Sequence, residues 1–98
     1  AAGSGVNMLA CYLRRRSRES GKEIDGKIHI QTKVLQPHIA SLLNMSREHI
    51  TRLFARLQDQ GFVAFNQGYP IIDKQWLQQA VTDPDLADFI VYRDYPQG

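Results

Sequence analysis

The sequence predicts one α+β domain, and three of its features lead to that prediction. The chain has 98 residues, which is enough for a single hydrophobic core. Two neighbouring segments have helical periodicity and are separated by a short polar turn. Two short apolar runs around Asn66-Gln67-Gly68 then have the pattern of a β-hairpin. Two helices joined by a tight turn and followed by a hairpin make a winged helix-turn-helix.

The N-terminal part of the chain predicts a helix and then a strand. Residues 1–5 are Ala, Gly and Ser only, and we expect a linker or an expression remnant there. A helix from residue 6 to about residue 18 follows from apolar residues at helical spacing: Val6, Leu9, Ala10 and Leu13. Residues 23–27 have the composition of a polar turn. Residues 27–34 then alternate apolar and polar side chains, as a half-buried strand does.

The centre of the chain predicts the two helices of the pair. Pro37 fits the first turn of the first helix, because its missing N–H costs nothing there. Asn44 tolerates the left-handed conformation in which a chain can leave a helix. Ser46 is a favourable N-cap for the second helix, over residues 46–60, and Glu48 adds negative charge to its first turn. Apolar residues at i, i+3, i+4 and i+7 mark the buried side of this helix: Ile50, Leu53, Phe54 and Leu57.

The C-terminal part predicts the hairpin, a last short helix and an acidic extension. The hairpin strands are expected over residues 62–65 and 69–72. Asp73 can cap a short helix, which Asp83-Pro84 ends. We therefore expect the winged-helix domain to cover residues 6–81, with an acidic extension of unassigned structure over residues 82–98.

Charge and cysteine content limit the classes of function. Residues 1–78 contain eleven Lys or Arg and six Asp or Glu, whereas residues 79–98 contain one Arg and four Asp. A basic body with an acidic end permits a polyanionic partner. The single cysteine, Cys11, excludes an internal disulfide and a cysteine-rich metal site. No apolar run is long enough to span a membrane, so we expect a cytoplasmic protein without a membrane partner.

The second helix of the pair has side chains suited to reading DNA. The 3.6-residue helical turn places Arg47, Glu48 and Arg52 on the side opposite the apolar residues. In a helix-turn-helix protein, the start of this helix enters the major groove. Arginine matches the O6 and N7 atoms of guanine, and glutamate can accept a hydrogen bond from cytosine N4. The alternative is a solvated surface with a Glu48–Arg52 ion pair worth ~0.2–0.5 kcal/mol. The adjoining turn and hairpin favour the DNA reader.

Residues 38–77, HIASLLNMSREHITRLFARLQDQGFVAFNQGYPIIDKQWL, resemble the DNA-binding domain of the cyclic-AMP-receptor/fumarate-nitrate-regulator (Crp/Fnr) family of bacterial transcription factors. The general helix-turn-helix pattern is matched by Ala40, Asn44 and Ile50. The family's recognition helix begins Ser-Arg-Glu and has an Arg four residues later, which is similar to Ser46-Arg47-Glu48 and Arg52. With the preceding helix and strand, the resemblance covers roughly residues 6–80.

The resemblance implies sequence-specific binding of double-stranded DNA, with base contacts by Arg47, Glu48 and Arg52. We expect contacts to the DNA backbone from Gln36, Ser46, His49, Thr51 and Gly68. It also implies a palindromic site bound by a homodimer of the full-length protein, with RNA polymerase as a candidate partner. No cofactor is expected in this fragment; a cyclic-nucleotide-like effector would belong to a sensor domain outside it.

Three departures from the family pattern concern contacts to phosphates. The family usually has Thr and Arg where this chain has Leu35 and Gln36, and usually Gly where it has Asn44. The wing tip, Asn66-Gln67-Gly68-Tyr69, has no basic side chain of its own.

A second interpretation of the sequence is a winged helix that serves as a protein-interaction or dimerisation module. The acidic end and the apolar stretch Phe89-Ile90-Val91-Tyr92 motivate it. An enzyme is not expected, because no nucleophile–base constellation appears. Three histidines are too widely spaced for a local metal-ligand pair: His29, His38 and His49. The arginines at the end of the first helix are expected to be solvated there: Arg14, Arg15, Arg16 and Arg18.

Overall fold

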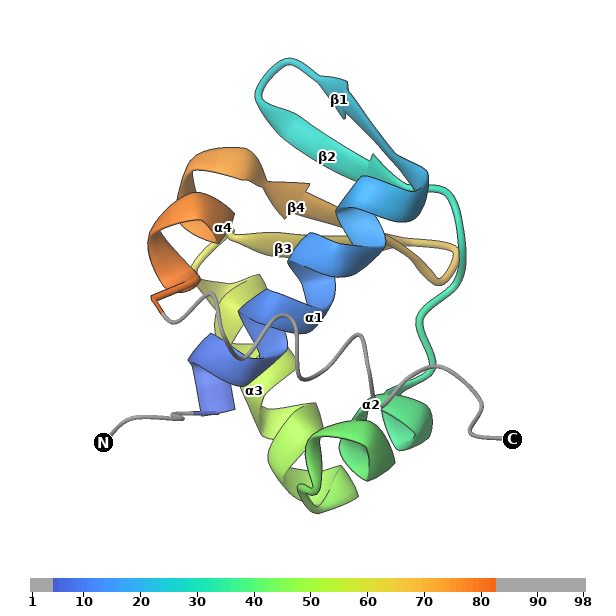
Figure 1. Ribbon diagram of the computed structural model, residues 1–98, viewed down its shortest axis with the longest axis vertical. Helices are drawn as coiled ribbons and strands as arrows, with labels where there is room; N and C mark the ends of the chain where they lie inside the picture. Colours follow the sequence, from blue (N-terminus) through green and yellow to red (C-terminus); the bar gives the residue numbers. More distant parts are fainter. Residues whose placement is uncertain (1–4, 83–98) are drawn as a thin grey trace.

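Four helices and one antiparallel sheet make up the part of the chain that the computed structural model describes, residues 5–82 (Figure 1). In chain order the elements are α1 (Gly5–Ser20), β1 (Gly21–Ile24), β2 (Lys27–Ile30), α2 (Gln36–Leu43), α3 (Arg47–Asp59), β3 (Val63–Asn66), β4 (Tyr69–Asp73) and α4 (Lys74–Ala80). This order confirms the predicted α+β class and its winged helix-turn-helix arrangement. Most of the predicted extension, residues 83–98, and most of the predicted linker lie outside the described residues.

The sheet has the strand order β1-β2-β4-β3, and all neighbouring strands are antiparallel. Its two hairpins have the same kind of turn. Asp25-Gly26 joins β1 to β2 and Gln67-Gly68 joins β3 to β4, and all four residues have positive φ angles. Two central residues with positive φ are the requirement of a type I′ turn, which suits the right-handed twist of a hairpin. Asn66 pairs with Tyr69, so the wing turns on two residues, one fewer than predicted.

The structure corrects the sequence prediction for residues 21–34. Residues 23–27 were expected to form a polar turn, but only Asp25-Gly26 turns, and the preceding Gly21–Ile24 forms β1. All four residues of β1 are exposed, so this edge strand has no alternating apolar pattern to reveal it. The next strand ends at Ile30 and not at residue 34, because the chain leaves the sheet there to reach α2.

Gly21 allows the chain to pass directly from α1 into β1. A Cβ atom at this position would overlap the carbonyl oxygen of Ser17 and would lie 2.8 Å from Cγ2 of Ile28. Only glycine therefore fits between the helix and the hairpin. The helix ends at Ser20, two residues beyond the end that its apolar spacing predicts. The helix begins at Gly5, a residue that was assigned to the linker.

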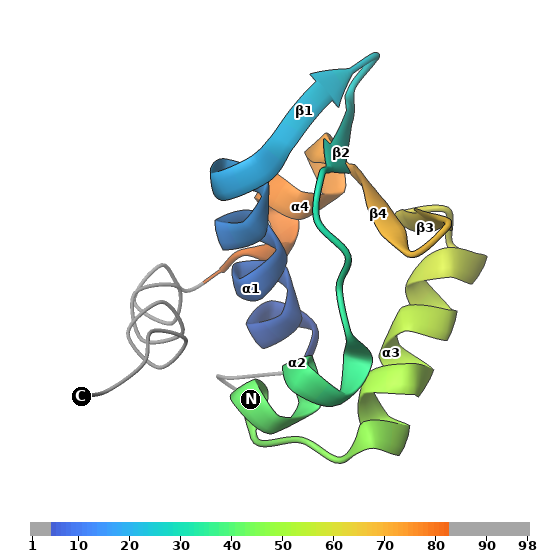
Figure 2. The same ribbon diagram turned by 90° about the vertical axis from the view of Figure 1, so that its right-hand side faces the viewer.

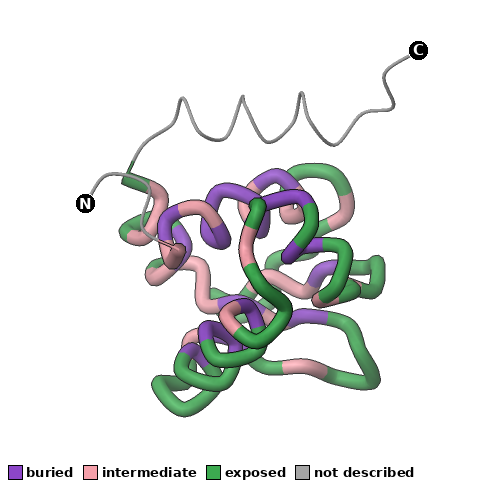
Figure 3. Tube along the Cα trace, turned by 90° about the horizontal axis from the view of Figure 1, so that it is seen from below, coloured by how far each residue is buried: buried purple, intermediate pink, exposed green. Residues whose placement is uncertain are grey.

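The core lies between α1 and α3, with the sheet above and α2 below it in the view of Figure 2. Buried positions follow the inner sides of the helices (Figure 3). Large side chains that are at most 2% exposed come from α1, β2, α2, α3 and β4: Leu9, Leu13, Ile30, Ile39, Leu43, Ile50, Phe54 and Ile72. The apolar stripes predicted for the first and third helices are therefore the sides that pack.

Candidate nucleic-acid interface

The turn between α2 and α3 has the geometry that its sequence predicts. Asn44 has φ 57° and ψ 46°, which is the left-handed region. The Asn44 N–H donates to the Ser41 carbonyl and the Met45 N–H donates to the Ala40 carbonyl, at 3.3 and 2.9 Å. These two bonds form a Schellman motif, which satisfies carbonyl groups at the end of α2. The motif sets the direction in which the chain enters α3.

α3, the recognition helix of the prediction, begins with a side-chain cap. The Ser46 hydroxyl oxygen accepts a hydrogen bond from the His49 backbone N–H at 3.0 Å. The hydroxyl proton of Ser46 is still available to donate to an acceptor such as a phosphate oxygen. Ser46 and Gln60 flank the helix Arg47–Asp59, so the predicted limits 46–60 are confirmed when the two caps are included.

The recognition helix has one buried and one exposed side. Its buried residues are those that the sequence predicted: Ile50, Leu53, Phe54 and Leu57. The predicted base-reading residues, Arg47, Glu48 and Arg52, are all exposed. Within residues 5–82, no ion pair joins Glu48 to Arg52. The charged ends of these side chains are therefore not occupied by each other, as a plain solvated i, i+4 pair would require.

Two of the expected backbone-contacting residues meet where α2 begins beside α3. The Thr51 hydroxyl lies 3.0 Å from Oε1 of Gln36 and 3.0 Å from the Arg47 carbonyl oxygen. It has one proton and can donate to only one of these acceptors at a time. Thr51 is exposed and Gln36 is half-buried, so the contact joins the start of α2 to the exposed side of the recognition helix.

His49 is half-buried because the start of α1 lies against it. A Cβ atom at Gly5 would be 3.3 Å from His49 Nε2 and 3.1 Å from Leu53 Cδ1. The first residue of α1 therefore packs on side chains of the recognition helix. The remaining predicted residue, Gly68, is exposed in the turn of the wing, the hairpin β3–β4.

The recognition helix is connected to the wing by a pair of aromatic rings. Phe54 of α3 is fully buried, and its ring meets the ring of Phe65 in β3 edge to face. The ring centroids are 5.3 Å apart and the ring planes make an angle of 70°. This geometry is favourable for aromatic pairs. It fixes the wing relative to the recognition helix.

A lysine that the sequence did not single out lies at the wing tip. Lys33 follows β2, and a Cβ atom at Gly68 would meet its Cδ at 3.5 Å. The Lys33 Nζ lies 5.8 Å from the centroid of the Tyr69 ring. The sequence predicts residue 33 to lie in a strand, and no local pattern relates it to Gly68. The position of Lys33 follows from the pairing of β2 with β4, which directs the chain after Ile30 towards the wing. This pairing was not predicted from the sequence.

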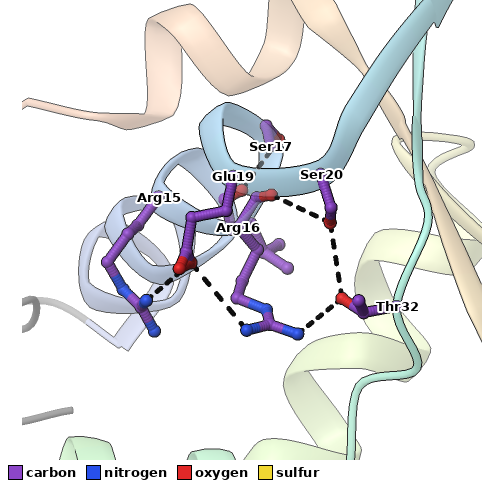
Figure 4. Close-up of polar contacts among 7 residues, drawn as sticks. Arg15, Arg16, Ser17, Glu19, Ser20 and Thr32 are labelled. Carbon is purple, nitrogen blue, oxygen red and sulfur yellow. Dashed lines mark hydrogen bonds and ion pairs between the residues drawn. The ribbon is translucent and has the colours of Figure 1, made fainter. Parts of the chain in front are cut away.

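Part of the arginine cluster at the end of α1 has a structural role instead of the expected solvated one. Arg15 is buried, and its Nη1 lies 2.7 Å from Oε1 of Glu19 (Figure 4). Arg16 donates from Nη2 to the Thr32 hydroxyl, which also lies 3.4 Å from the Ser20 hydroxyl. These contacts tie α1 to the segment that follows β2.

Neither a metal-ligand cluster nor a membrane-spanning helix occurs in residues 5–82. No three His, Cys, Asp or Glu side chains gather closely enough to hold a metal ion in this described part of the chain. None of its helices has both the length and the apolar character that crossing a membrane requires.

Comparisons with known proteins agree with this architecture. The fold is similar to that of oxidized CprK in complex with o-chlorophenolacetic acid, with a TM-score of 0.68 and 13% identity over 93% of this chain and 39% of that one. It is also similar to TTHA1359, a transcriptional regulator of the CRP/FNR family from Thermus thermophilus, with a TM-score of 0.64 and 20% identity over 82% of this chain and 41% of that one.

The present chain thus spans about two fifths of the length of each of these proteins. No curated protein matches its sequence. Residues 9–80 match the family model of the Crp-like helix-turn-helix domain. Because that match covers most of the chain, the protein belongs to the family of Crp-like helix-turn-helix domains, the DNA-binding modules of transcription regulators.

Proposed function

We propose that this domain binds double-stranded DNA sequence-specifically, with α3 in the major groove and Arg47, Glu48 and Arg52 on base edges. One observation carries the proposal. α3 has an N-terminal cap, packs its apolar side on the core, and exposes Arg47, Glu48 and Arg52 on the other side. In the described part of the chain, Glu48 and Arg52 form no ion pair with each other. These are the residue types that recognise guanine and cytosine in the major groove.

Five residues are proposed to contact the sugar-phosphate backbone: Gln36, Ser46, His49, Thr51 and Gly68. Ser46 and His49 lie at the start of α3, where free backbone N–H groups and the helix dipole favour an anion. Gln36 and Thr51 lie together beside the exposed side of α3. Gly68 is exposed at the wing tip, where its backbone can approach DNA. Such contacts would set the orientation of the helix in the groove.

The wider function belongs to a longer regulator of which this chain would be the DNA-binding part. The fact that the chain spans two fifths of each similar structure supports this. The palindromic site, the homodimer, the effector-binding sensor domain and RNA polymerase as a partner are parts of the same proposal, and they rest on the family. A cytoplasmic location follows from the same role, since the DNA target lies there in bacteria.

Selection from a random duplex library tests the proposal. The unaltered chain and a variant with Arg47, Glu48 and Arg52 all replaced by Ala are compared at low and moderate salt. We expect the unaltered chain to enrich a motif that contains G·C pairs and the variant to lose it. Arg56→Ala is the matched control, because it removes an exposed arginine near the end of the same helix and should keep the motif.

The outcomes separate the two functional interpretations. Salt-sensitive binding without an enriched motif would leave only attraction to phosphates and would contradict base reading. No binding at low salt, with a dimeric mass in light scattering, would instead favour the protein-interaction module.

A further inference from the structure

The wing of this protein lacks a positive charge of its own, and the neighbouring chain segment supplies one. The wing tip reads Asn66-Gln67-Gly68-Tyr69, without Lys or Arg. Lys33 lies against it: a Cβ atom at Gly68 would meet Cδ, Cγ and Cε of Lys33 at 3.5–3.7 Å. The aliphatic part of this side chain thus packs over the glycine, while the ammonium group reaches the Tyr69 ring at 5.8 Å. That distance is within the range of a cation–π contact.

The segment that carries Lys33 is held on both sides of it. Before Lys33, the Gln31 N–H donates to the Ser20 carbonyl at 3.0 Å. The Thr32 hydroxyl accepts a hydrogen bond from the Arg16 guanidinium (Figure 4). After Lys33, the Leu35 carbonyl accepts the first hydrogen bond of α2, from the Ile39 N–H at 3.1 Å. The backbone of residue 33 is therefore fixed, although its side chain is exposed.

The charge of Lys33 is available for an external anion. In residues 5–82, no carboxylate forms an ion pair with this lysine. Tyr69 is 40% exposed, so the ring against which the ammonium group lies also borders solvent. An ammonium group is a compact point charge with three donors, which suits a phosphate oxygen.

Lys33 lies close to the recognition helix as well as to the wing. It lies only three positions before Gln36, which meets Thr51 of α3. Three residues of chain span at most ~10 Å, which is roughly the axial rise of three nucleotides along one DNA strand. Lys33 thus lies between the wing tip, which it contacts, and the Gln36–Thr51 contact beside the exposed side of α3. A duplex with α3 in its major groove would bring a phosphate strand across this region.

We propose that Lys33, held against the Tyr69 ring, binds a phosphate of the DNA backbone and provides the positive charge that the wing itself lacks. The inference rests on the proposed DNA binding and adds a residue to it. The ligand is a phosphodiester, and the contact carries no base preference.

The test is the salt dependence of DNA binding by the full chain and its Lys33→Gln variant. Fluorescence anisotropy with a duplex of roughly 25 base pairs of mixed sequence reports affinity at several salt concentrations. When one phosphate contact is lost, the negative slope of log K against log salt should become less steep by about 0.9. Binding at 0.1 M salt should become about eightfold weaker. Lys22→Gln is the control. It removes an exposed lysine from β1, at the far edge of the sheet from the wing, and should leave the slope unchanged.

Two further variants separate a phosphate contact from a structural effect. Lys33→Arg keeps the charge and should retain the slope, whereas Tyr69→Leu should weaken binding less than Lys33→Gln does, with the slope kept. Equal melting temperatures of the unaltered chain and Lys33→Gln would show that the fold is intact, as expected for an exposed side chain. If the unaltered chain bound DNA and Lys33→Gln had the same slope of log K against log salt, the role of Lys33 would be wrong, whereas the proposed function would stand. If the unaltered chain bound no DNA, both this inference and the proposed function would be wrong.

Discussion

Removing the ring of Phe54 should weaken the connection between the recognition helix and the wing. Phe54→Leu keeps the site apolar but deletes half of the edge-to-face pair with Phe65, whose centroid is 5.3 Å away. Because Phe54 is fully buried, we expect a loss of ~1–2 kcal/mol from burial and packing. The ring pair itself adds ~0.5–1.5 kcal/mol. The sum, about 1.5–3.5 kcal/mol, is a large part of the ~4–12 kcal/mol expected for a domain of this size.

A double-mutant cycle isolates the ring pair from the burial. Phe54→Leu, Phe65→Leu and the double variant are unfolded with guanidinium chloride and followed by circular dichroism. The double variant should be less destabilised than the sum of the single variants, by about 0.5–1.5 kcal/mol.

Phe62 provides the matched control for this cycle. Its ring stacks on Trp76, with centroids 5.7 Å apart, and it is not part of the Phe54–Phe65 pair. Phe62→Leu should therefore add to Phe54→Leu within about 0.5 kcal/mol. A coupling between Phe54 and Phe65 no larger than that of the control would refute the view that these rings connect helix and wing.

Three other changes give results that are simple to measure. Gly21→Ala forces a Cβ atom onto the Ser17 carbonyl and should cost ~1–3 kcal/mol, seen as a melting temperature lower by several degrees; an unchanged melting temperature would contradict the proposed fit. Ser46→Ala removes the cap of α3 and should cost ~1 kcal/mol in denaturant unfolding, whereas Ser46→Gly should cost only a few tenths; equal costs would speak against a side-chain cap. Arg52→Ala should weaken binding to the best site by ~1–3 kcal/mol and flatten preference at one position, and an unchanged selected motif would remove its base-reading role.

The helix-turn-helix could be predicted because its signals are local. Pro37, Asn44 and Ser46 each restrict the backbone within one or two residues of themselves, and each has the conformation that its type favours. The apolar side of α3 likewise follows from helical spacing alone. The same spacing predicts that Arg47, Glu48 and Arg52 are exposed on the opposite side of the helix. Their contacts with DNA stay a prediction.

What could not be predicted depends on contacts between distant parts of the chain. β1 is an exposed edge strand, and only its pairing with β2 makes it a strand. Lys33 is near Gly68 because β2 pairs with β4, a fact that no segment of sequence contains. Arg15 is buried against Glu19 although its neighbours in sequence suggest a solvated helix end. The type and spacing of residues indicate which side of a helix or strand is buried. The order of the strands in the sheet decides which of these sides come into contact.

The contact between Gly5 and the recognition helix has a mechanical consequence. A methyl group added at Gly5 would lie only 3.1 Å from Leu53 Cδ1 and 3.3 Å from His49 Nε2, so the two helices are closely packed at this contact. Close-packed groups pass small displacements on to their neighbours, since there is no empty space to absorb them. A pull or a rotation applied to the chain ahead of α1 would therefore reach α3 through one layer of atoms, without passing through the sheet.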